Sequence, residues 1–239
     1  PEPGPRSLEA AAALARAARA ASAGSEVWVL LSGGTTSLIG APVPGISPQE
    51  LTGLYALLLG SGLDITAMNR IRKRFSRWGA GRLAVALAPA PVRVYVVSDV
   101  IGDDLASIGS GPLVADDATA ADVRALLEQA GLLARIPPAL RSRLAAVERG
   151  EMPETPKPGD PAFARVTLEL IASNRLALEA AARRAAELGL APVITEVPLA
   201  GEASAVGASV AAALLQDCAG RTIPQPEAGA LRRPEAPPR

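Results

Sequence analysis

The stretch that decides the fold is Val92-Arg-Val-Tyr-Val-Val-Ser-Asp-Val-Ile-Gly-Asp-Asp104, which continues through Leu105-Ala-Ser-Ile-Gly-Ser-Gly-Pro112. Its first six residues are mostly β-branched or aromatic and lie between Pro91 and a Gly-containing turn, so they predict a buried strand. Asp99 follows the end of that strand. In open parallel α/β sheets, ligands bind in the crevice outside the carboxyl ends of the strands. The stretch therefore predicts a functional carboxylate at this crevice.

Two further acidic residues, Asp103 and Asp104, follow Asp99 within one turn. Three carboxylates can then converge on the crevice and bind Mg²⁺, which takes hard oxygen ligands and usually shares them with substrate phosphates. A structural alternative stays open, because Asp is among the best helix N-caps. Asp103 or Asp104 would in that case only cap a short helix over Leu105–Ile108.

A Gly-rich, hydroxyl-rich turn follows another predicted strand, Glu26–Leu31. It reads Ser32-Gly-Gly-Thr-Thr-Ser-Leu38. Backbone N–H groups in such a turn can bind a phosphate or carboxylate without obstruction from Cβ atoms. The alternative is a tight turn whose hydroxyls satisfy the local backbone. The turn matches neither the Walker loop nor the spaced-Gly dinucleotide fingerprint.

A basic helix is predicted over Ile65–Trp78, and the break Gly79-Ala-Gly-Arg82 follows it. Its polar and basic residues are Asn69, Arg70, Arg72, Lys73, Arg74 and Arg77. Their spacing alone favours a solvated face. A cationic helix beside a Gly break can instead supply positive charge to a polyanionic ligand, with bidentate geometry from Arg.

The remaining pattern alternates helices with strands. Helices are predicted over residues 7–21, 47–59, 82 onward, 119–129, 136–147, 174–188 and 201–215, and strands over 167–173 and 192–197. Such alternation is typical of a parallel sheet covered by helices on both faces. The predicted fold class is α/β: a three-layer α/β/α arrangement with a mainly parallel, Rossmann-like sheet.

Composition bounds the function. The chain has 239 residues, 24 basic and 24 acidic side chains, no histidine and one cysteine, Cys218. Zero formal charge gives no indication of a nucleic-acid or anionic-membrane partner. The missing histidine excludes Ser-His, Cys-His and His-ligated zinc mechanisms within this chain. The single cysteine and the lack of a secretory signal at the start predict a cytoplasmic protein, and no apolar run reaches membrane-spanning length.

Five blocks in order and spacing resemble the glycerate 2-kinases of bacteria and animals, in which a large domain precedes a smaller one called MOFRL. The blocks are Leu31-Ser-Gly-Gly-Thr-Thr-Ser-Leu38, Ser61-Gly-Leu-Asp-Ile65, Asn69-Arg-Ile-Arg-Lys-Arg-Phe-Ser76, Gly81-Arg-Leu-Ala84, and Ser98-Asp-Val-Ile-Gly-Asp-Asp104 with Ser110-Gly-Pro112. The resemblance implies ATP- and Mg²⁺-dependent phosphoryl transfer to the 2-hydroxyl of D-glycerate. Relatives are also labelled hydroxypyruvate reductases, but no dinucleotide fingerprint supports that activity here.

The expected site residues follow from these blocks and from the crevice. Asp99 is expected to be catalytic, and Asp99, Asp103 and Asp104 to bind the metal. Substrate or nucleotide binding is expected of Ser32, Gly33, Gly34, Thr35, Thr36, Ser37, Asn69, Arg72, Lys73, Arg82, Ser110 and Gly111. The expected partners are ATP and D-glycerate, with a homo-oligomer as a further possibility.

The chain also departs from the family pattern. It has neither the upstream Gly-Lys-Ala motif with its active-site lysine nor the Gly-Gly-Arg-Asn loop of the smaller domain, and it reads Gly79-Ala-Gly81 where most relatives read Lys-Gly-Gly. We therefore expect residues 1–216 to be a partial kinase large domain and 217–239 a disordered or aberrant tail. Such a fragment is expected to be inactive alone and to expose apolar surface. The alternative is a non-catalytic protein that binds a nucleotide or hydroxy acid.

Overall fold

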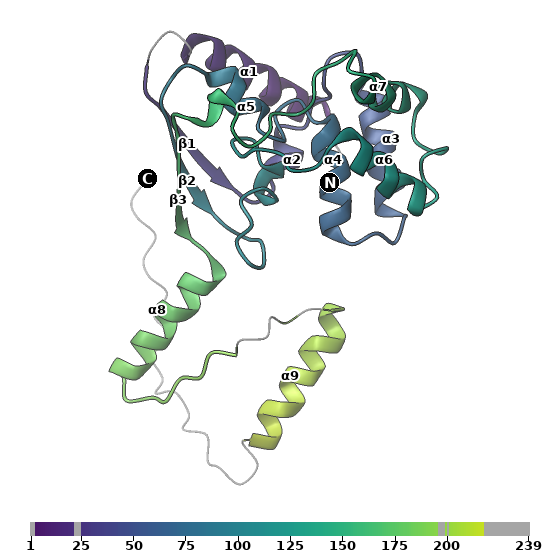
Figure 1. Cartoon of the computed structure of the whole chain (residues 1–239). Helices are drawn as coiled ribbons and strands as arrows, with labels where there is room; N and C mark the ends of the chain where they lie inside the picture. The colour runs from purple at the N-terminus through teal and green to yellow at the C-terminus, as the bar shows by residue number, and fades with distance from the viewer. Residues whose placement is uncertain (1–2, 22–24, 196–198, 200, 218–239) are drawn as a thin grey trace. The chain divides into compact units, whose positions relative to one another are not determined.

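The computed structural model describes residues 3–21, 25–195, 199 and 201–217 (Figure 1). The helices are α1 (Pro5–Ala21), α2 (Thr35–Leu38), α3 (Pro48–Leu59), α4 (Ile65–Phe75), α5 (Arg82–Leu87), α6 (Ala120–Gln129), α7 (Pro138–Glu148), α8 (Asn174–Glu187) and α9 (Ala203–Asp217). Strands β1 (Val27–Ser32), β2 (Val92–Val97) and β3 (Val166–Ala172) complete the fold with the 3₁₀ turns η1 (Ile108–Ser110) and η2 (Pro161–Phe163). The chain divides into two compact units, residues 1–193 and 194–239.

The three strands form one parallel sheet in the order β1-β2-β3. Alternate side chains point to the same face, so Val92, Val94 and Val96 of β2 are all buried there. Helix α1 covers this face with Ala11, Ala15 and Ala18, whose small side chains allow close approach, and α5 lies beside it (Figure 1). The α/β class and the parallel sheet are confirmed.

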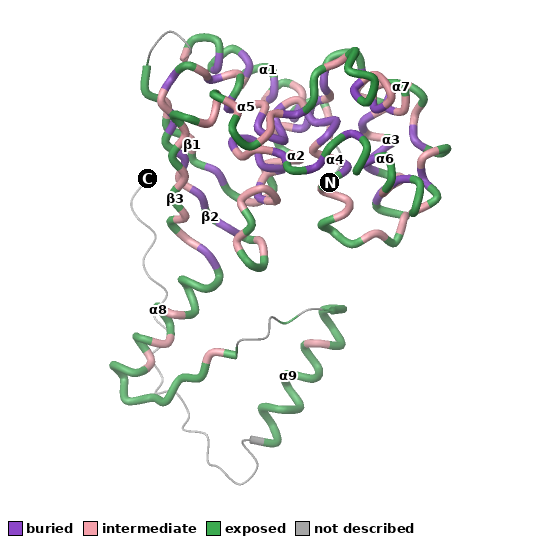
Figure 2. Tube along the Cα trace, in the orientation of Figure 1, coloured by how far each residue is buried: buried purple, intermediate pink, exposed green. Residues whose placement is uncertain are grey.

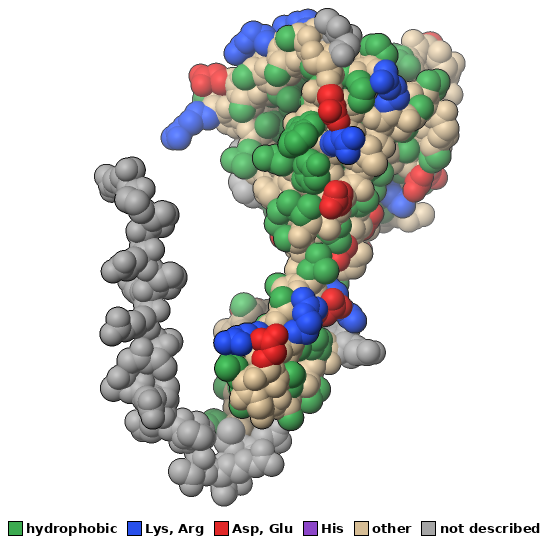
Figure 3. All heavy atoms as spheres, turned by 90° about the vertical axis from the view of Figure 1, so that its left-hand side faces the viewer, with side chains coloured by type: hydrophobic (Ala, Val, Ile, Leu, Met, Phe, Trp, Pro, Cys, Tyr) green, Lys and Arg blue, Asp and Glu red, His purple; other side chains and the backbone are tan. Residues whose placement is uncertain are grey.

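The opposite face of the sheet is exposed among the described residues and carries large apolar side chains beside Arg93, Thr167 and Glu169. Trp28 is 65% exposed, Leu30 80% and Ile171 50%. The rings of Trp28 and Tyr95 contact each other edge to face across neighbouring strands, with centroids 5.9 Å apart. Exposed positions, in green, alternate with purple and pink ones along the strands in Figure 2, and hydrophobic side chains lie together on the side shown in Figure 3. This uncovered surface matches the exposed apolar surface expected from the sequence.

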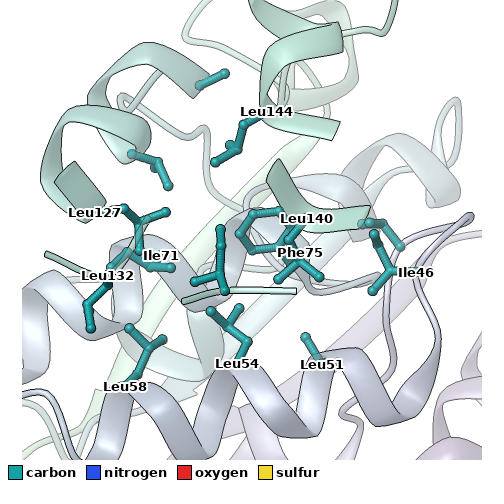
Figure 4. Packing of buried hydrophobic residues seen from close by; sticks show 14 of the residues in the cluster. Ile46, Leu51, Leu54, Leu58, Ile71, Phe75, Leu127, Leu132, Leu140 and Leu144 are labelled. Atoms are coloured by element: carbon teal, nitrogen blue, oxygen red, sulfur yellow. The ribbon is translucent and has the colours of Figure 1, made fainter. Parts of the chain in front are cut away.

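A second core lies among α3, α4, α6 and α7 (Figure 4). Leu51, Leu54 and Leu58 form one stripe of α3, since positions three or four apart share a helix face. They pack with Ile71 and Phe75 of α4, which are fully buried. This helical core fixes α4, the basic helix, beside the carboxyl ends of the strands.

Several predicted boundaries change in the structure. The helix predicted over Ile65–Trp78 ends at Phe75, because Ser76 is extended and forms an antiparallel bridge with Pro42. The helix predicted over Leu105–Ile108 is replaced by the single 3₁₀ turn η1. Residues 192–195 of the predicted strand 192–197 form no strand, and residues 196–197 lie outside the described residues.

The predicted tail is helical at its start, because α9 extends to Asp217. The rest of that tail, including Cys218, lies outside the described residues. Within the described part of the chain, no helix is both long and apolar enough to cross a membrane.

Candidate functional site

A pocket of ≈ 550 Å³ lies where β1 and β2 end and α4 passes alongside. Its lining brings together seven of the residues predicted for the site: Gly33, Gly34, Thr36, Ser37, Asn69, Arg72 and Asp99. The other lining residues are Tyr55, Ile65, Thr66, Val100, Ile101, Ser107 and Gly109. The position agrees with the crevice predicted at the carboxyl ends of parallel strands.

The Gly-rich turn forms the start of α2. Gly34 adopts φ 78°, a left-handed conformation that glycine reaches without strain, and helix α2 begins at Thr35. Thr35 Oγ1 donates to Ser32 O at 2.6 Å, and Ser37 Oγ donates to Gly34 O at 2.9 Å. Two hydroxyls thus satisfy local backbone, as the structural alternative anticipates. Ser37 N and Leu38 N donate to Gly34 O, so within the described residues only the N–H groups of Thr35 and Thr36 in α2 lack an acceptor and remain available to an anion.

The Asp99 side chain lies close to this turn, in space that is open because Gly33 has no side chain. A Cβ atom on Gly33 would lie 1.8 Å from Asp99 Oδ2 and 2.1 Å from its carboxyl carbon. Asp99 is exposed and, within the described residues, makes no hydrogen bond or ion pair. Its carboxylate is therefore free to accept a ligand proton or to join a metal ion.

Helix α4 supplies the polar groups on another side of the pocket. Asp64 caps the helix by accepting from Ala67 N at 2.8 Å, and this start places Asn69 and Arg72 toward the pocket. The Arg72 guanidinium lies over the Tyr55 ring, 5.0 Å from its centroid, in a cation–π contact. Burial, partly offset by the charge of Arg72, raises the pKa of Tyr55 to about 12, so its phenol is neutral at physiological pH.

Two buried polar atoms at this place, the Tyr55 hydroxyl and Arg72 Nε, have no hydrogen-bond partner in the part of the chain that the structure describes. Sequence reasoning did not select Tyr55, although it is one of only two tyrosines in the chain and lies on the buried stripe of α3. Thr66 and Ser107 were also not selected, since neither lies in a motif with its own chemistry. The helical spacing of Thr66 and Asn69, three residues apart, is a signal that could have identified Thr66.

The three carboxylates of the central stretch do not converge. Asp104 caps the following turn, with Oδ1 accepting from Ala106 N at 3.0 Å and Oδ2 from Ser107 Oγ at 2.5 Å. Asp103 adopts φ 54° and does not line the pocket. No group of three His, Cys, Asp or Glu side chains in the described ranges is arranged to hold a metal ion. The predicted convergence of the three carboxylates on one metal site is therefore wrong, and the capping alternative holds for Asp104.

Lys73 and Arg82 lie away from the pocket and serve the fold. Lys73 Nζ pairs with Asp116 Oδ1 at 2.8 Å, and Asp116 is 1% exposed. Arg82 donates to the carbonyls of Lys73, Arg74, Ser76 and Gly79 at 2.9–3.2 Å, so it satisfies the carbonyl groups at the end of α4. Neither side chain lines the pocket beside Asp99.

Ser110 and Gly111 lie behind the pocket wall. Gly109, Ser110 and Gly111 have φ values of 59°, 68° and 58°, an unusual run of left-handed residues. The carbonyls of Ser110 and Gly111 accept from Ala80 N at 2.9 Å and from Gly81 N at 2.8 Å. Ser110 Oγ also shares a hydrogen bond with Thr36 Oγ1 at 2.8 Å, which fixes the Gly-rich turn. Ser110 thus positions Thr36, which itself faces the pocket.

With the geometry established, comparison with known proteins identifies the family. The family described as "Domain of unknown function (DUF4147)" matches residues 1–145. A glycerate 2-kinase of Pyrococcus horikoshii is 37% identical over 198 residues, which cover 83% of this chain and 44% of that protein. The chain belongs to the glycerate kinase family. A putative hydroxypyruvate reductase of Agrobacterium vitis is 39% identical over 207 residues, which cover 87% of this chain and 51% of that protein.

Two solved structures are similar to this chain. A crystal structure of a Pyrococcus horikoshii OT3 protein superposes with a TM-score of 0.75 at 35% identity, covering 92% of this chain and 50% of that one. The glycerate kinase of Thermotoga maritima superposes with a TM-score of 0.68 at 31% identity, covering 79% and 42%. The chain therefore spans about half the length of the relatives it matches.

Proposed function

We propose that the pocket beside Asp99 takes part in ATP-dependent phosphoryl transfer to the 2-hydroxyl of D-glycerate. The relatives named glycerate 2-kinase and glycerate kinase support this activity. The observation that carries the proposal is the unpartnered Asp99 carboxylate, which lines one pocket together with the Gly-rich turn and Arg72. In this proposal residues 1–216 are a share of the large domain and 217–239 a tail. The protein is cytoplasmic, its partners are small molecules, and self-association into a homo-oligomer is compatible with it.

Each residue of the pocket has a task in this chemistry. Asp99 orients the 2-hydroxyl and accepts its proton, as a carboxylate near a reacting hydroxyl can. The N–H groups at the start of α2 and the Arg72 guanidinium bind the anionic groups of the substrates. Asn69 and the Thr36 hydroxyl donate or accept hydrogen bonds that fix orientation.

The pocket offers a magnesium ion one carboxylate ligand, Asp99. Mg²⁺ is commonly held by one or two carboxylates together with substrate phosphates and water, and Asp99 offers one free carboxylate. When bound, the ion would neutralise charge on the phosphates. Asp103 and Asp104 are not needed for it, since Asp104 is engaged in its turn.

The test replaces Asp99 by asparagine, which keeps the shape but removes the charge. Binding of ATP and D-glycerate is measured by calorimetry, and phosphorylation of glycerate is measured separately. In a reconstructed enzyme of the relatives' full length, we expect Asp99→Asn to lower kcat by about 100-fold or more, the scale of losing one acid–base or electrostatic contributor. Asp103→Asn is the matched control, because Asp103 does not line the pocket and asparagine tolerates its left-handed φ.

The outcomes separate the alternatives. Saturable ligand binding without turnover in the reconstructed full-length enzyme indicates the non-catalytic binding protein. Near-normal turnover of Asp99→Asn at saturating substrates would show that this pocket is not the active site. Reduction of hydroxypyruvate by a nicotinamide cofactor would instead indicate the reductase named among the relatives, for which the sequence has no dinucleotide fingerprint.

A further inference from the structure

A second and larger pocket, of ≈ 850 Å³, lies between α1, α5, α7 and the loop of residues 153–160. It shares no lining residue with the pocket beside Asp99. Its lining contains five basic side chains and two acidic ones: Arg19, Arg77, Arg82, Arg143, Lys157, Glu154 and Asp160. The chain as a whole has no net charge, so this excess of positive charge is local.

Apolar and aromatic groups form much of the remaining wall. Trp78 is 5% exposed and is anchored by its indole N–H, which donates to Ala11 O at 3.2 Å. The Arg77 guanidinium lies over the Trp78 ring, 5.0 Å from its centroid. Val85, Ala86 and Pro156 complete this wall. A rigid apolar wall beside guanidinium groups suits an organic ligand that carries an anionic group.

Two carboxylates beside the pocket are paired with other cations, and a third, Asp160, caps η2 by accepting from Ala162 N at 2.9 Å. Asp116 pairs with Lys73 at 2.8 Å, and Glu154 pairs with Arg74 at 2.5 Å and with Lys157 at 3.4 Å. Two carboxylates thus serve three cations. Burial raises the pKa of Glu154, but the hydrogen bonds from Arg74 and from Ala120 N, together with the charges of Arg74 and Lys157, outweigh it and lower the pKa to about 2. Glu154 is therefore ionised at neutral pH.

Arg82 and Arg143 have no carboxylate partner in the described ranges of the chain. Arg82 donates to backbone carbonyls, and Arg143 Nη1 donates to Pro44 O at 3.0 Å. Burial, reinforced by repulsion from Arg74 and Arg143, lowers the pKa of Arg82 to about 10. Burial and Arg74 likewise lower the pKa of Arg143. Both guanidiniums therefore lie in surroundings that disfavour uncompensated positive charge.

A small cavity of ≈ 10 Å³ lies among three arginines. Arg74, Arg82 and Arg143 line it, and no acidic residue does. Arg82, Arg143 and Pro153 line both this cavity and the larger pocket. Arg74 Nη2 is buried with no acceptor among the described residues, and the Arg74 side chain is only 4% exposed. The small cavity is about the size of one water molecule, so an anion would lie in the larger pocket and offset the local positive charge from there.

We propose that this pocket is a binding site for a small organic phosphate. The phosphate would lie on Arg143, Arg77 and Lys157, and its organic part against Trp78 and the apolar wall. Guanidinium groups bind phosphate oxygens in a bidentate manner, and a phosphate dianion matches an excess of more than one positive charge better than a single carboxylate does. The site is separate from the proposed kinase pocket and does not depend on it.

Tryptophan fluorescence gives a direct readout, because the chain has two tryptophans and only Trp78 lines the pocket. In a Trp28→Phe background, emission comes from Trp78 alone. Inorganic phosphate and phenyl phosphate are titrated, with phenol as the uncharged probe. We expect a saturable change with both phosphates, tighter binding of phenyl phosphate, and no saturation with phenol below about 10 mM.

Arg143→Gln and Arg141→Gln are a matched pair on α7. Each arginine donates Nη1 to one backbone carbonyl, Arg143 to Pro44 O at 3.0 Å and Arg141 to Ala134 O at 3.1 Å, but only Arg143 lines the pocket. We expect Arg143→Gln to raise the Kd for phosphate about tenfold and Arg141→Gln to change it by less than about twofold.

A melting curve of each variant checks that the fold is kept. If Arg143→Gln fails to fold, Arg77→Gln replaces it, since Arg77 is partly exposed and its described contact is with the Trp78 ring. Equal phosphate affinities in the pocket variant and in Arg141→Gln would overturn the proposal, as would a Trp78 emission that does not respond to phosphate. Asp99→Asn should leave this affinity unchanged, which keeps the result separate from the kinase proposal.

Discussion

Replacing Gly33 by alanine should displace Asp99 while leaving the fold intact. The new Cβ would lie 1.8 Å from Asp99 Oδ2, far inside a normal van der Waals separation, so the carboxylate must move by more than about 1 Å. Asp99 is exposed, and its side chain can rotate away. A misplacement of about 1 Å at a reacting group can lower turnover by roughly 100-fold.

The effect of Gly33→Ala on the free energy of unfolding should be small. Forcing the Asp99 side chain into a poorer rotamer costs about 0.5–1.5 kcal/mol, and the reduced entropy of the unfolded chain returns about 0.4–1 kcal/mol. Gly34→Ala is the matched control, because it should lower the free energy of unfolding without displacing Asp99. No atom lies within 4 Å of a Cβ at Gly34, but its φ of 78° costs a non-glycine residue roughly 1–2 kcal/mol.

Chemical denaturation and ligand-binding calorimetry separate the two variants. Gly33→Ala should weaken ligand binding or turnover with near-normal stability, whereas Gly34→Ala should lose stability and place Asp99 normally. In an Asp99→Ala background the overlap is gone, and Gly33→Ala should then be neutral or slightly stabilising. Equal behaviour of the two glycine variants, or an unchanged effect of Gly33→Ala in the Asp99→Ala background, would refute this account of the turn.

Three further outcomes are expected. The pKa of Glu154 is lowered from 4.5 to about 2, so the stability that its ionised form gives the fold is complete above pH about 4.5 and is lost as pH falls toward 2. The melting temperature of Glu154→Gln should therefore change less between these pH values than that of the parent chain. An equal change of melting temperature in both would contradict the ion pair. Leu30→Lys on the exposed sheet face should reduce self-association in light scattering, and a parent chain that is already monodisperse would argue against an adhesive face. Asp104→Ala should lower stability by roughly 1 kcal/mol in denaturation and spare ligand affinity, while a loss of affinity would return Asp104 to the site.

Local sequence signals located most elements of this protein. Ser47 and Glu50 form the capping box that opens α3, as the pattern Ser47-Pro-Gln-Glu50 predicts. The β-branched run ending before Asp99 forms the central strand, and the Gly-rich turn follows β1. These signals succeed because a cap, a strand and a tight turn depend on residues close together in the chain.

Tertiary structure decided which polar residues share a pocket. Lys73 and Arg72 are neighbours in one basic run, yet Arg72 lies over Tyr55 in the pocket and Lys73 pairs with the buried Asp116. Nothing in the run itself distinguishes them, because the direction of each side chain depends on which helix packs against that face of α4. Arg82, expected at the ligand, is held instead by the carbonyls at the end of α4.

The sequence by itself determined the α/β class, the parallel strands and the place of the crevice, because periodicity and turn chemistry are encoded locally. Only the tertiary structure decided that Asp104 caps a turn, that Asp99 fits beside Gly33, and that Arg82 and Arg143 meet Arg74 around a cavity without a carboxylate. These contacts join segments that are distant in the chain. Their energies depend on burial and on the partners that folding brings together, which no local pattern specifies.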